Sequence, residues 1–411
     1  MLKNCFIYRL PHVFGEACKP NYNSVISTWI YNSINNLEIN VFDRSIEMHY
    51  VYVQDVVDEF LSILETKKSS EIYIEPKKIY QTTLGEVVDF INEFKINIMN
   101  ENYFIENNEF KQKLFKTYQD YLNRVNILVT GSNGQVGSEI KAISSNYAYN
   151  FFFTDRNVID ITNKENIKAY CQTNNINVII NCAGYTAVDK AQSDEINTDL
   201  VNRKAVKKLA LVCEELNIKL IHISTDYVFD GKNFKPYCEQ YKTNPQSVYG
   251  KSKLDGENEM IKINPKNSII IRTSWVYSYY GANFVKTMLR LAKEKKSLGV
   301  IFDQIGTPTY ARDLAKVILD IIPQINNTKV EIYNYSNEGV LSWYDFAKEI
   351  MKMAKLDCKI NPIETFQYPT PAKRPHFSLL NKSKIKTKFN IEIPYWKDGL
   401  DDCLRRLGER R

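Results

Sequence analysis

The sequence predicts an α/β fold in which a doubly wound parallel sheet carries a smaller α/β lobe, preceded by a truncated second copy of such a lobe. Three observations lead to this fold class. An apolar run enters a glycine-rich turn near residue 131, later apolar strands end in small or hydroxyl-bearing residues, and segments of the first 95 residues recur near the end of the chain. Strands that alternate with helical patterns favour a parallel sheet.

The glycine-rich turn is the clearest local signal. Residues 127–137 read Ile-Leu-Val-Thr-Gly-Ser-Asn-Gly-Gln-Val-Gly, an apolar strand that turns into a helical pattern. Gly131 lets the chain turn, Gly134 lets backbone amides approach a pyrophosphate, and Gly137 lets the helix pack closely on the strand. The sequence therefore predicts a Rossmann-like, dinucleotide-binding sheet that starts near Val125.

Three further strands support this sheet. The run 151–155 ends in Asp155, about 20 residues after the turn, where the adenosine ribose of a dinucleotide is usually held. The runs 178–186 and 220–226 end in small and hydroxyl-bearing residues, which leave room for a cofactor across the carboxyl ends of the strands. His222 lies inside an apolar strand and is predicted to be a core residue.

Tyr249 and Lys253 form the candidate catalytic pair. Their spacing of four places both side chains on one face of a helix, about one turn apart. An ammonium close to a phenol favours the phenolate, so we expect Lys253 to lower the pKa of Tyr249 toward neutrality. The pair is predicted to donate and accept a proton during catalysis.

An internal repeat organises the first part of the chain. Residues 6–15 and 269–278 share the order of apolar strand, arginine and aromatic turn, and residues 71–86 match 331–343 at the same spacing of about 260 residues. The first copy lacks the glycine turn and the catalytic pair. We therefore predict that residues 1–95 are a partial substrate lobe without independent catalysis.

The predicted domains follow from this repeat. Residues 96–124 are expected to form a linker and an amphipathic helix, with the boundary at 123–125 and one complete domain over 125–411. In that domain, residues 125–290 are expected to supply most of the dinucleotide-binding half, and 269–285 with 340–411 most of the substrate lobe. Half a fold leaves apolar surface uncovered, so the first copy should dock on the second domain or on another copy, or be partly disordered.

Composition excludes several classes of protein. The 411 residues carry a formal net charge of +6 without an extended basic tract, so nucleic acid is not an expected partner. No apolar run approaches the length of a membrane span, and the N-terminus does not resemble a signal peptide. The eight scattered cysteines are expected to be reduced thiols, as in a cytoplasmic protein.

Several motifs together resemble one family. They are residues 130–137, 181–191, 224–231, 249–253, 272–277 and 283–288, with Arg374, Pro375, Ser378, Leu380 and Asn381. This set resembles the dTDP-4-dehydrorhamnose reductase family of extended short-chain dehydrogenase/reductases, over essentially all of 125–411. Residues 1–122 resemble the substrate-binding half of capsular-polysaccharide sugar-nucleotide reductases and epimerases, through residues 8–11, 20–25 and 50–57.

The resemblance implies a reaction and three catalytic roles. The reaction is reduction of the C4 keto group of dTDP-4-dehydro-6-deoxy-L-mannose to dTDP-L-rhamnose, a precursor of cell-surface polysaccharide. Tyr249 would give a proton to the new alkoxide. Lys253 would hold the nicotinamide ribose and tune Tyr249, and Thr225 would hydrogen-bond the keto oxygen. The resemblance leaves a homodimer open.

It also implies two sets of binding residues. Thr225, Asp226, Trp275 and Arg374 would contact the substrate, with Arg374 at a phosphate. The cofactor-binding set comprises Gly131, Asn133, Gly134, Gln135, Val136, Gly137, Asp155, Arg156, Asp160, Ile161, Ala183, Gly184, Tyr185, Thr186, Ile223, Tyr249 and Lys253.

Cofactor identity and magnesium stay open at this point. Asp155 suits the free ribose of NADH, whereas Arg156 beside it suits the 2′-phosphate of NADPH. Some members of the family bridge subunits through magnesium and glutamates. Glu139 matches one such position, although an exposed helical glutamate is more often simply solvated.

Three alternatives compete with this reductase. A 4,6-dehydratase is disfavoured because Tyr227 stands where such enzymes carry a glutamate after Thr225 and Asp226. A reductase or epimerase of a UDP-linked N-acetylated 4-keto-6-deoxy sugar is the closest rival. A non-catalytic dinucleotide-binding regulatory subunit ranks third, because such a subunit is expected to have lost the tyrosine–lysine motif or the glycine turn, and both are intact here.

Overall fold

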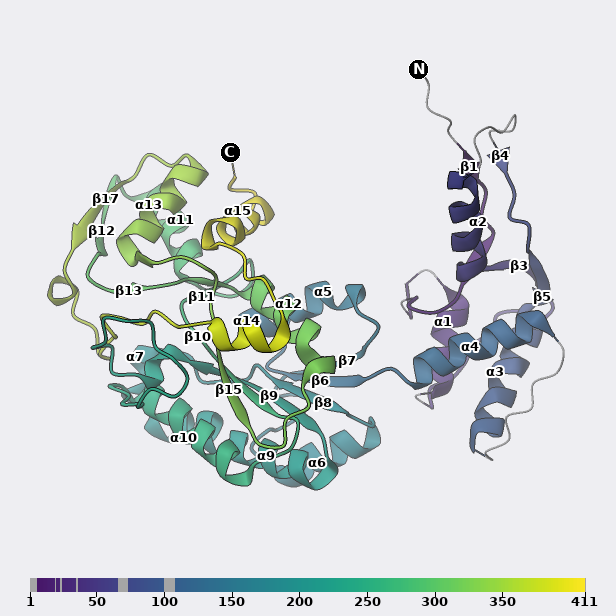
Figure 1. Ribbon diagram of the computed structural model, residues 1–411, viewed down its shortest axis with the longest axis horizontal. Coiled ribbons are helices and arrows are strands. Elements are labelled where there is room, and N and C mark those ends of the chain that lie inside the picture. The colour runs from purple at the N-terminus through teal and green to yellow at the C-terminus, as the bar shows by residue number, and fades with distance from the viewer. Residues whose placement is uncertain are drawn as a thin grey trace, which may run out of the picture. The chain divides into compact units, whose positions relative to one another are not determined.

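The computed structural model describes residues 6–18, 20–22, 24–34, 36–65, 73–99 and 108–410 (Figure 1). The chain divides into two compact units, Met1–Arg124 and Val125–Arg411. Asn23, Glu71 and Ile72, which belong to segments used in the sequence comparison, lie outside the described residues, as do residues 100–107 of the predicted linker. None of the helices in the described part of the chain is long and apolar enough to cross a bilayer.

The second unit is built on a six-stranded parallel sheet in the order β15-β10-β9-β8-β6-β7. The strands are β6 (Asn126–Thr130), β7 (Asn150–Thr154), β8 (Val178–Asn181), β9 (Lys219–Thr225), β10 (Ile269–Thr273) and β15 (Glu331–Tyr335). Their apolar runs are typical of parallel strands covered on both faces. The register pairs Thr130 with Asn181 and Thr225 with Thr273, so polar residues meet at the carboxyl edge of the sheet.

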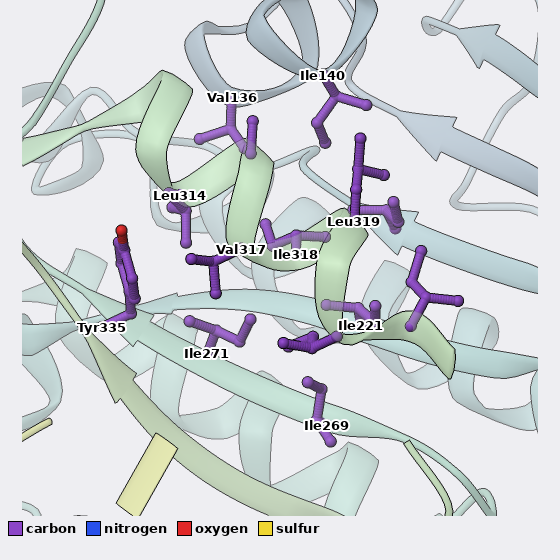
Figure 2. Close-up of a cluster of buried hydrophobic side chains, with 14 of the residues drawn as sticks. Val136, Ile140, Ile221, Ile269, Ile271, Leu314, Val317, Ile318, Leu319 and Tyr335 are labelled. Atoms are coloured by element: carbon purple, nitrogen blue, oxygen red, sulfur yellow. The ribbon is translucent and has the colours of Figure 1, made fainter. Parts of the chain in front are cut away.

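Helices cover both faces of this sheet, which confirms the predicted α/β class. Helices α5 (Gln135–Ile143) and α12 (Ala311–Ile321) pack on one face. Helices α6 (Lys164–Thr173), α9 (Ala205–Leu216) and α10 (Val248–Ile263) cover the other (Figure 1). Figure 2 shows Val136 and Ile140 of α5 near Leu314 and Ile318 of α12, above the strand residue Ile271.

A smaller lobe has its own core. Its helices are α11 (Phe284–Glu294), α13 (Trp343–Ala354) and α15 (Trp396–Arg406). Its strands form three pairs: β11 (Val276–Tyr277) with β14 (Thr309–Tyr310), β12 (Ser297–Ile301) with β17 (Lys359–Ile363), and β13 (Ile305–Gly306) with β16 (Leu341–Ser342). The sheet layers also use α12 and β15, beyond the range 125–290 expected to supply most of them.

Short elements complete the second unit. They are η1 (Ser144–Asn146), α7 (Val188–Ala191), α8 (Glu195–Asp199), the π-helical η2 (Leu200–Lys204), η3 (Asp226–Val228), η4 (Ile322–Gln324), η5 (Thr365–Gln367) and α14 (Ser383–Phe389).

The described residues of the first unit form two small sheets and four helices. Strand β1 (Ile7–Tyr8) pairs with β4 (Tyr73–Ile74), and β3 (Glu47–Tyr52) lies between β2 (His12–Phe14) and β5 (Tyr80–Thr83). The helices are α1 (Val25–Ile34), α2 (Val53–Glu65), α3 (Leu84–Met99) and α4 (Glu109–Leu122). Within the segment 96–124, expected to be a linker with a helix, α4 packs Phe110, Leu114 and Tyr118 into the core of this unit.

The two units repeat the same order of pairings. β1 pairs in parallel with β4 as β10 does with β15, and β2 pairs in parallel with β3 as β11 does with β14. Helix α2 follows β3 directly, as α12 follows β14. The first unit also contains a tyrosine and a lysine four residues apart, Tyr73 and Lys77, which is the spacing of the catalytic pair. Tyr73 lies in strand β4 and Pro76 stands between the two residues, so they share no helix face and the match is coincidental.

The counterpart helices differ in burial. Phe60 and Leu61 on α2 are 43% and 56% exposed, whereas Ile318 and Leu319 at the matching positions of α12 are fully buried. Helix α5 packs on α12 in the second unit. Exposed apolar residues on α2 are therefore expected in a partial copy of this fold that has no described helix in the place of α5.

Candidate active site

The glycine turn brings three backbone segments into close contact. Gly131 has a φ of +63°, and a Cβ there would lie 2.6 Å from the backbone nitrogen of Ala183. A Cβ on Gly137 would lie 2.6 Å from the Gly131 carbonyl oxygen. Both positions therefore exclude a side chain. This cradle fits a dinucleotide pyrophosphate at the start of α5, where no described side chain caps Gly134.

The end of β7 lies beside this turn. The Asn133 amide donates to the Asp155 carboxylate at 2.8 Å, and the Asn157 N–H donates to its other oxygen. Arg156 is exposed. Asp160 accepts from the backbone and hydroxyl of Thr162, which shapes the following turn and leaves its neighbour Ile161 against the core.

Asn202 fixes the loop after β8, which holds Ala183, Gly184, Tyr185 and Thr186. The Tyr185 N–H donates to the Asn202 side chain at 2.8 Å, and Asn202 donates back to the Tyr185 carbonyl at 3.1 Å. Asn202 also donates to the Ser252 hydroxyl on α10. The loop is thereby attached to the helix that carries the catalytic pair. Nothing in the sequence pattern pointed to Asn202.

Helix α10 starts close to the end of β9. The Ser247 hydroxyl caps it by accepting from the Gly250 N–H at 3.1 Å. A Cβ on Gly250 would lie 2.3 Å from the Tyr227 carbonyl oxygen, so glycine allows this approach. Tyr249 is thereby buried, with its ring 5.5 Å from that of Tyr227 in an edge-to-face arrangement.

The predicted effect of Lys253 on Tyr249 is wrong for this structure. Burial raises the pKa of Tyr249 to about 12, and a hydrogen bond with Thr225 only partly opposes the rise. The Lys253 ammonium instead donates to the Ile223 carbonyl at 2.5 Å and lies 3.4 Å from His222 Nε2. Burial lowers the pKa of Lys253 to about 8, against the opposing charge of Glu257.

His222 is a core residue, as predicted, but it also contacts the site. It is fully buried between the Asn181 amide, 3.0 Å from Nδ1, and Lys253. Burial and the Lys253 charge hold its pKa well below the usual value, so the ring is neutral. The contact between His222 and Lys253 could not be predicted, because an apolar strand around a histidine indicates only that it is buried.

Thr225 and Asp226 form the hydroxyl and carboxyl part of the site. The Thr225 hydroxyl donates to Asp226 Oδ1 at 3.0 Å, and both side chains are buried. Burial raises the pKa of Asp226 to about 7, although hydrogen bonds from Thr225 and Ser378 oppose this. Thr225, Asp226 and Tyr249 therefore meet at the end of β9, and Lys253 contacts the same strand at the Ile223 carbonyl.

The predicted substrate contacts lie toward the smaller lobe. Arg374 forms a bidentate ion pair with Asp189, at 2.8 and 3.1 Å. Trp275 has a φ of +47° and stacks on Trp343 with ring centroids 3.7 Å apart. A cavity of about 590 Å³ opens beside them, lined by Phe284, Gln304, Trp343 and Arg374 among others. Trp343 was not predicted.

Gln135 and Glu139 on α5 face the smaller lobe. Gln135 accepts from Asn283 at 3.1 Å. Glu139 is fully buried, and both its oxygens lie 2.8 Å from Arg406 Nη1, with Ser278 donating at 2.7 Å. The expectation of a solvated Glu139 is wrong, and its oxygens are committed to these donors. The described residues contain no cluster of three or more histidine, cysteine or acidic side chains arranged for a metal.

The matching family model, described as RmlD substrate binding domain, covers residues 125–409. A dTDP-4-dehydrorhamnose reductase from Aggregatibacter actinomycetemcomitans is 42% identical over 284 residues, which are 67% of this chain and 96% of the relative.

Two solved structures have the same fold. A dTDP-4-dehydrorhamnose reductase from Clostridium acetobutylicum is 39% identical with a TM-score of 0.66, covering 69% of this chain and 100% of that one. The enzyme from Bacillus anthracis, solved in complex with NADP, is 33% identical with a TM-score of 0.65, covering 69% and 99%. With the glycine cradle, the tyrosine–lysine helix and these matches together, residues 125–409 make this chain a member of the dTDP-4-dehydrorhamnose reductase family of extended short-chain dehydrogenase/reductases.

Proposed function

We propose that the chain reduces the C4 keto group of dTDP-4-dehydrorhamnose to the hydroxyl of dTDP-L-rhamnose, in the synthesis of cell-surface polysaccharide precursors. The observation that carries this proposal is the convergence of Tyr249, Thr225 and Lys253 beside the loop that packs on Gly131. Two hydroxyl donors next to a buried ammonium suit an oxygen on which negative charge develops.

The side chains divide the work of the reaction. A bound nicotinamide dinucleotide supplies the hydride that adds to C4. Thr225 orients the keto oxygen, and Tyr249 gives its phenolic proton to the resulting alkoxide. Because burial raises the pKa of Tyr249 to about 12, the phenol holds its proton at neutral pH and is ready to donate it.

The cofactor proposed here is NADPH. The exposed Arg156 stands next to Asp155, whose carboxylate is held by Asn133. A guanidinium in that place pairs with a 2′-phosphate. The relative from Bacillus anthracis, which is 33% identical, was solved with NADP. Arg156→Ala should lower kcat/KM for NADPH about tenfold and leave that for NADH unchanged.

The nucleotide of the substrate is proposed to occupy the cavity of the smaller lobe. Phe284 and Trp343 give it aromatic walls, and Arg374 provides a cation at its edge. This combination suits a base linked to a diphosphate.

Product analysis tests the assignment. The purified chain is incubated with NADPH and either dTDP-4-dehydrorhamnose or a UDP-linked N-acetylated 4-keto-6-deoxy sugar. We expect dTDP-L-rhamnose as the main product, whereas preferential reduction of the UDP sugar would replace this proposal by its closest rival. Tyr249→Phe should abolish turnover and change the Kd of NADPH less than about twofold, since the phenol acts on the substrate.

The first unit is proposed to contribute no catalysis of its own. Its described residues repeat elements that follow β9, and none of these residues forms a counterpart of α5 on the exposed face of α2. Limited proteolysis at 123–125 should release a compact fragment that retains full reductase activity. A fragment without activity would assign the first unit a role in the reaction.

A further inference from the structure

Glu257 on α10 is a buried carboxylate that the reaction above does not use. It lies one helical turn after Lys253 and is fully buried. Its Oε1 accepts from the Ser224 hydroxyl at 2.5 Å. Arg272 donates to its two oxygens through Nε at 3.0 Å and Nη2 at 2.6 Å.

The partners of Glu257 come from the two strands that flank the site. Ser224 belongs to β9 and Arg272 to β10. Arg272 also donates to the Glu239 carbonyl at 3.2 Å and lies over the ring of Phe229. A single carboxylate on α10 thus joins the carboxyl ends of two adjacent strands to the catalytic helix.

The sequence positions of these contacts give them a catalytic meaning. Ser224 stands between Ile223, whose carbonyl accepts from Lys253, and Thr225, which hydrogen-bonds Tyr249. Any shift of β9 along α10 would move the carbonyl away from Lys253 and the hydroxyl away from Tyr249 together. A buried ion pair contributes little net stability by itself, so its role in fixing geometry is the more informative one.

We propose that Glu257 is a positioning residue for the proposed reduction: by bonding Ser224 and Arg272 at once, it fixes the register of β9 and β10 against α10 and so holds Lys253 and Thr225 in place. It acts through these residues and does not touch the reacting atoms. The charged and titratable groups around Lys253 are Glu257 on the same helix, His222 on β9 and Cys182 after β8. Arg272 on β10 balances the charge of Glu257.

Glu257→Gln tests the proposal because glutamine keeps the shape and loses the charge. The unpaired Arg272 then disfavours the charged form of Lys253. We expect kcat to fall about tenfold or more, NADPH to bind more weakly in a fluorescence titration, and the alkaline limb of the kcat profile to move about one unit toward lower pH. The double variant Glu257→Gln/Arg272→Met removes both charges. It should therefore return the alkaline limb of the kcat–pH profile toward its wild-type pH.

Two further variants separate positioning from folding. Ser224→Ala leaves no unpaired buried charge and should lower kcat severalfold without moving the limb; it serves also if Glu257→Gln does not fold. Asp255→Asn on the same helix removes an exposed ion pair with Lys251 and should change nothing. A folded Glu257→Gln with wild-type kcat and pH profile, or a Ser224→Ala variant with wild-type kcat, would overturn the proposal.

A failure of the proposed function can be distinguished from a failure of the role proposed for Glu257. If the wild-type chain binds NADPH but reduces neither sugar nucleotide, the assigned reaction is wrong, and the effect of Glu257→Gln on NADPH affinity still decides the role of Glu257. If the wild-type chain reduces its substrate and Glu257→Gln is unchanged, only the role of Glu257 is rejected.

Discussion

Arg374 and Asp189 form a bidentate ion pair although 185 residues separate them in the chain. The pair attaches the proline-rich loop before His376 to helix α7, which follows the cofactor loop. The hydrogen bond that Arg374 donates lowers the pKa of Asp189, so the pair is charged at neutral pH.

If Arg374 serves the substrate diphosphate, its removal should act on binding. Arg374→Ala is expected to raise KM for the sugar nucleotide about ten- to a hundredfold, with a smaller effect on kcat, because charge-assisted hydrogen bonds to phosphate are lost. Steady-state kinetics check this. Lys373→Ala, at the exposed neighbouring position, is the control, and an equal effect of both variants would contradict a specific contact.

Asp226 should make stability depend on pH. Burial raises its pKa from 3.8 to about 7. Between these two pH values the folded state therefore keeps a proton that the unfolded state has lost. The stability from this proton is complete below pH 3.8 and is lost as the pH rises through about 7. Asp226→Asn keeps a neutral group and should raise the free energy of unfolding at pH 8 by up to about 4 kcal/mol.

Urea denaturation at several pH values measures this effect. The gain should shrink as the pH falls below 7. Asp230→Asn is a matched control, because backbone hydrogen bonds hold the pKa of Asp230 below its usual value and its ionised form is the stable one. A constant gain across the pH range would contradict the burial of a protonated Asp226.

Glu139 should matter for stability and not for metal binding. Glu139→Gln leaves the partly buried Arg406 without its counter-charge, so the free energy of unfolding is expected to fall by about 3 kcal/mol. Chemical denaturation measures the loss, with Glu165→Gln on the surface of α6 as the control. Addition of EDTA should leave activity unchanged, and a loss restored by Mg²⁺ would return Glu139 to consideration as a ligand.

The repeat supplies a matched pair of substitutions. Ile318→Ala opens a cavity beneath α5 and should cost about 2–5 kcal/mol, whereas Phe60→Ala at the same position of α2 should change stability by less than about 1 kcal/mol. Phe60→Ala should also lower the fluorescence of a bound hydrophobic dye. Equal destabilisation by the two variants would show that the α2 face is covered in solution.

Much of the site could be predicted because its signals are local. The glycine turn and the tyrosine–lysine spacing are set by residues within one strand–turn–helix or one helix, and the structure builds both. The pKa of Tyr249 could not be predicted, because it depends on elements that are distant in sequence. These elements bury the phenol beside Tyr227 and provide the Ile223 carbonyl to which Lys253 donates. Glu139 was misjudged for the same reason: its partners Ser278, Arg312 and Arg406 are all remote in sequence.

The chain of the second unit passes from the sheet into the smaller lobe after β10, returns for α12 and β15, and leaves again for α13. A cut between β11 and α15 would therefore separate the smaller lobe from some of its own elements. A cut just before β10 keeps them all together. The first unit contains counterparts of β10, β11, β14, α12 and β15, with an aromatic core of its own. A breakpoint just before β10 thus leaves the smaller lobe undivided, and the first unit shows that elements of this kind can form a folded interior of their own.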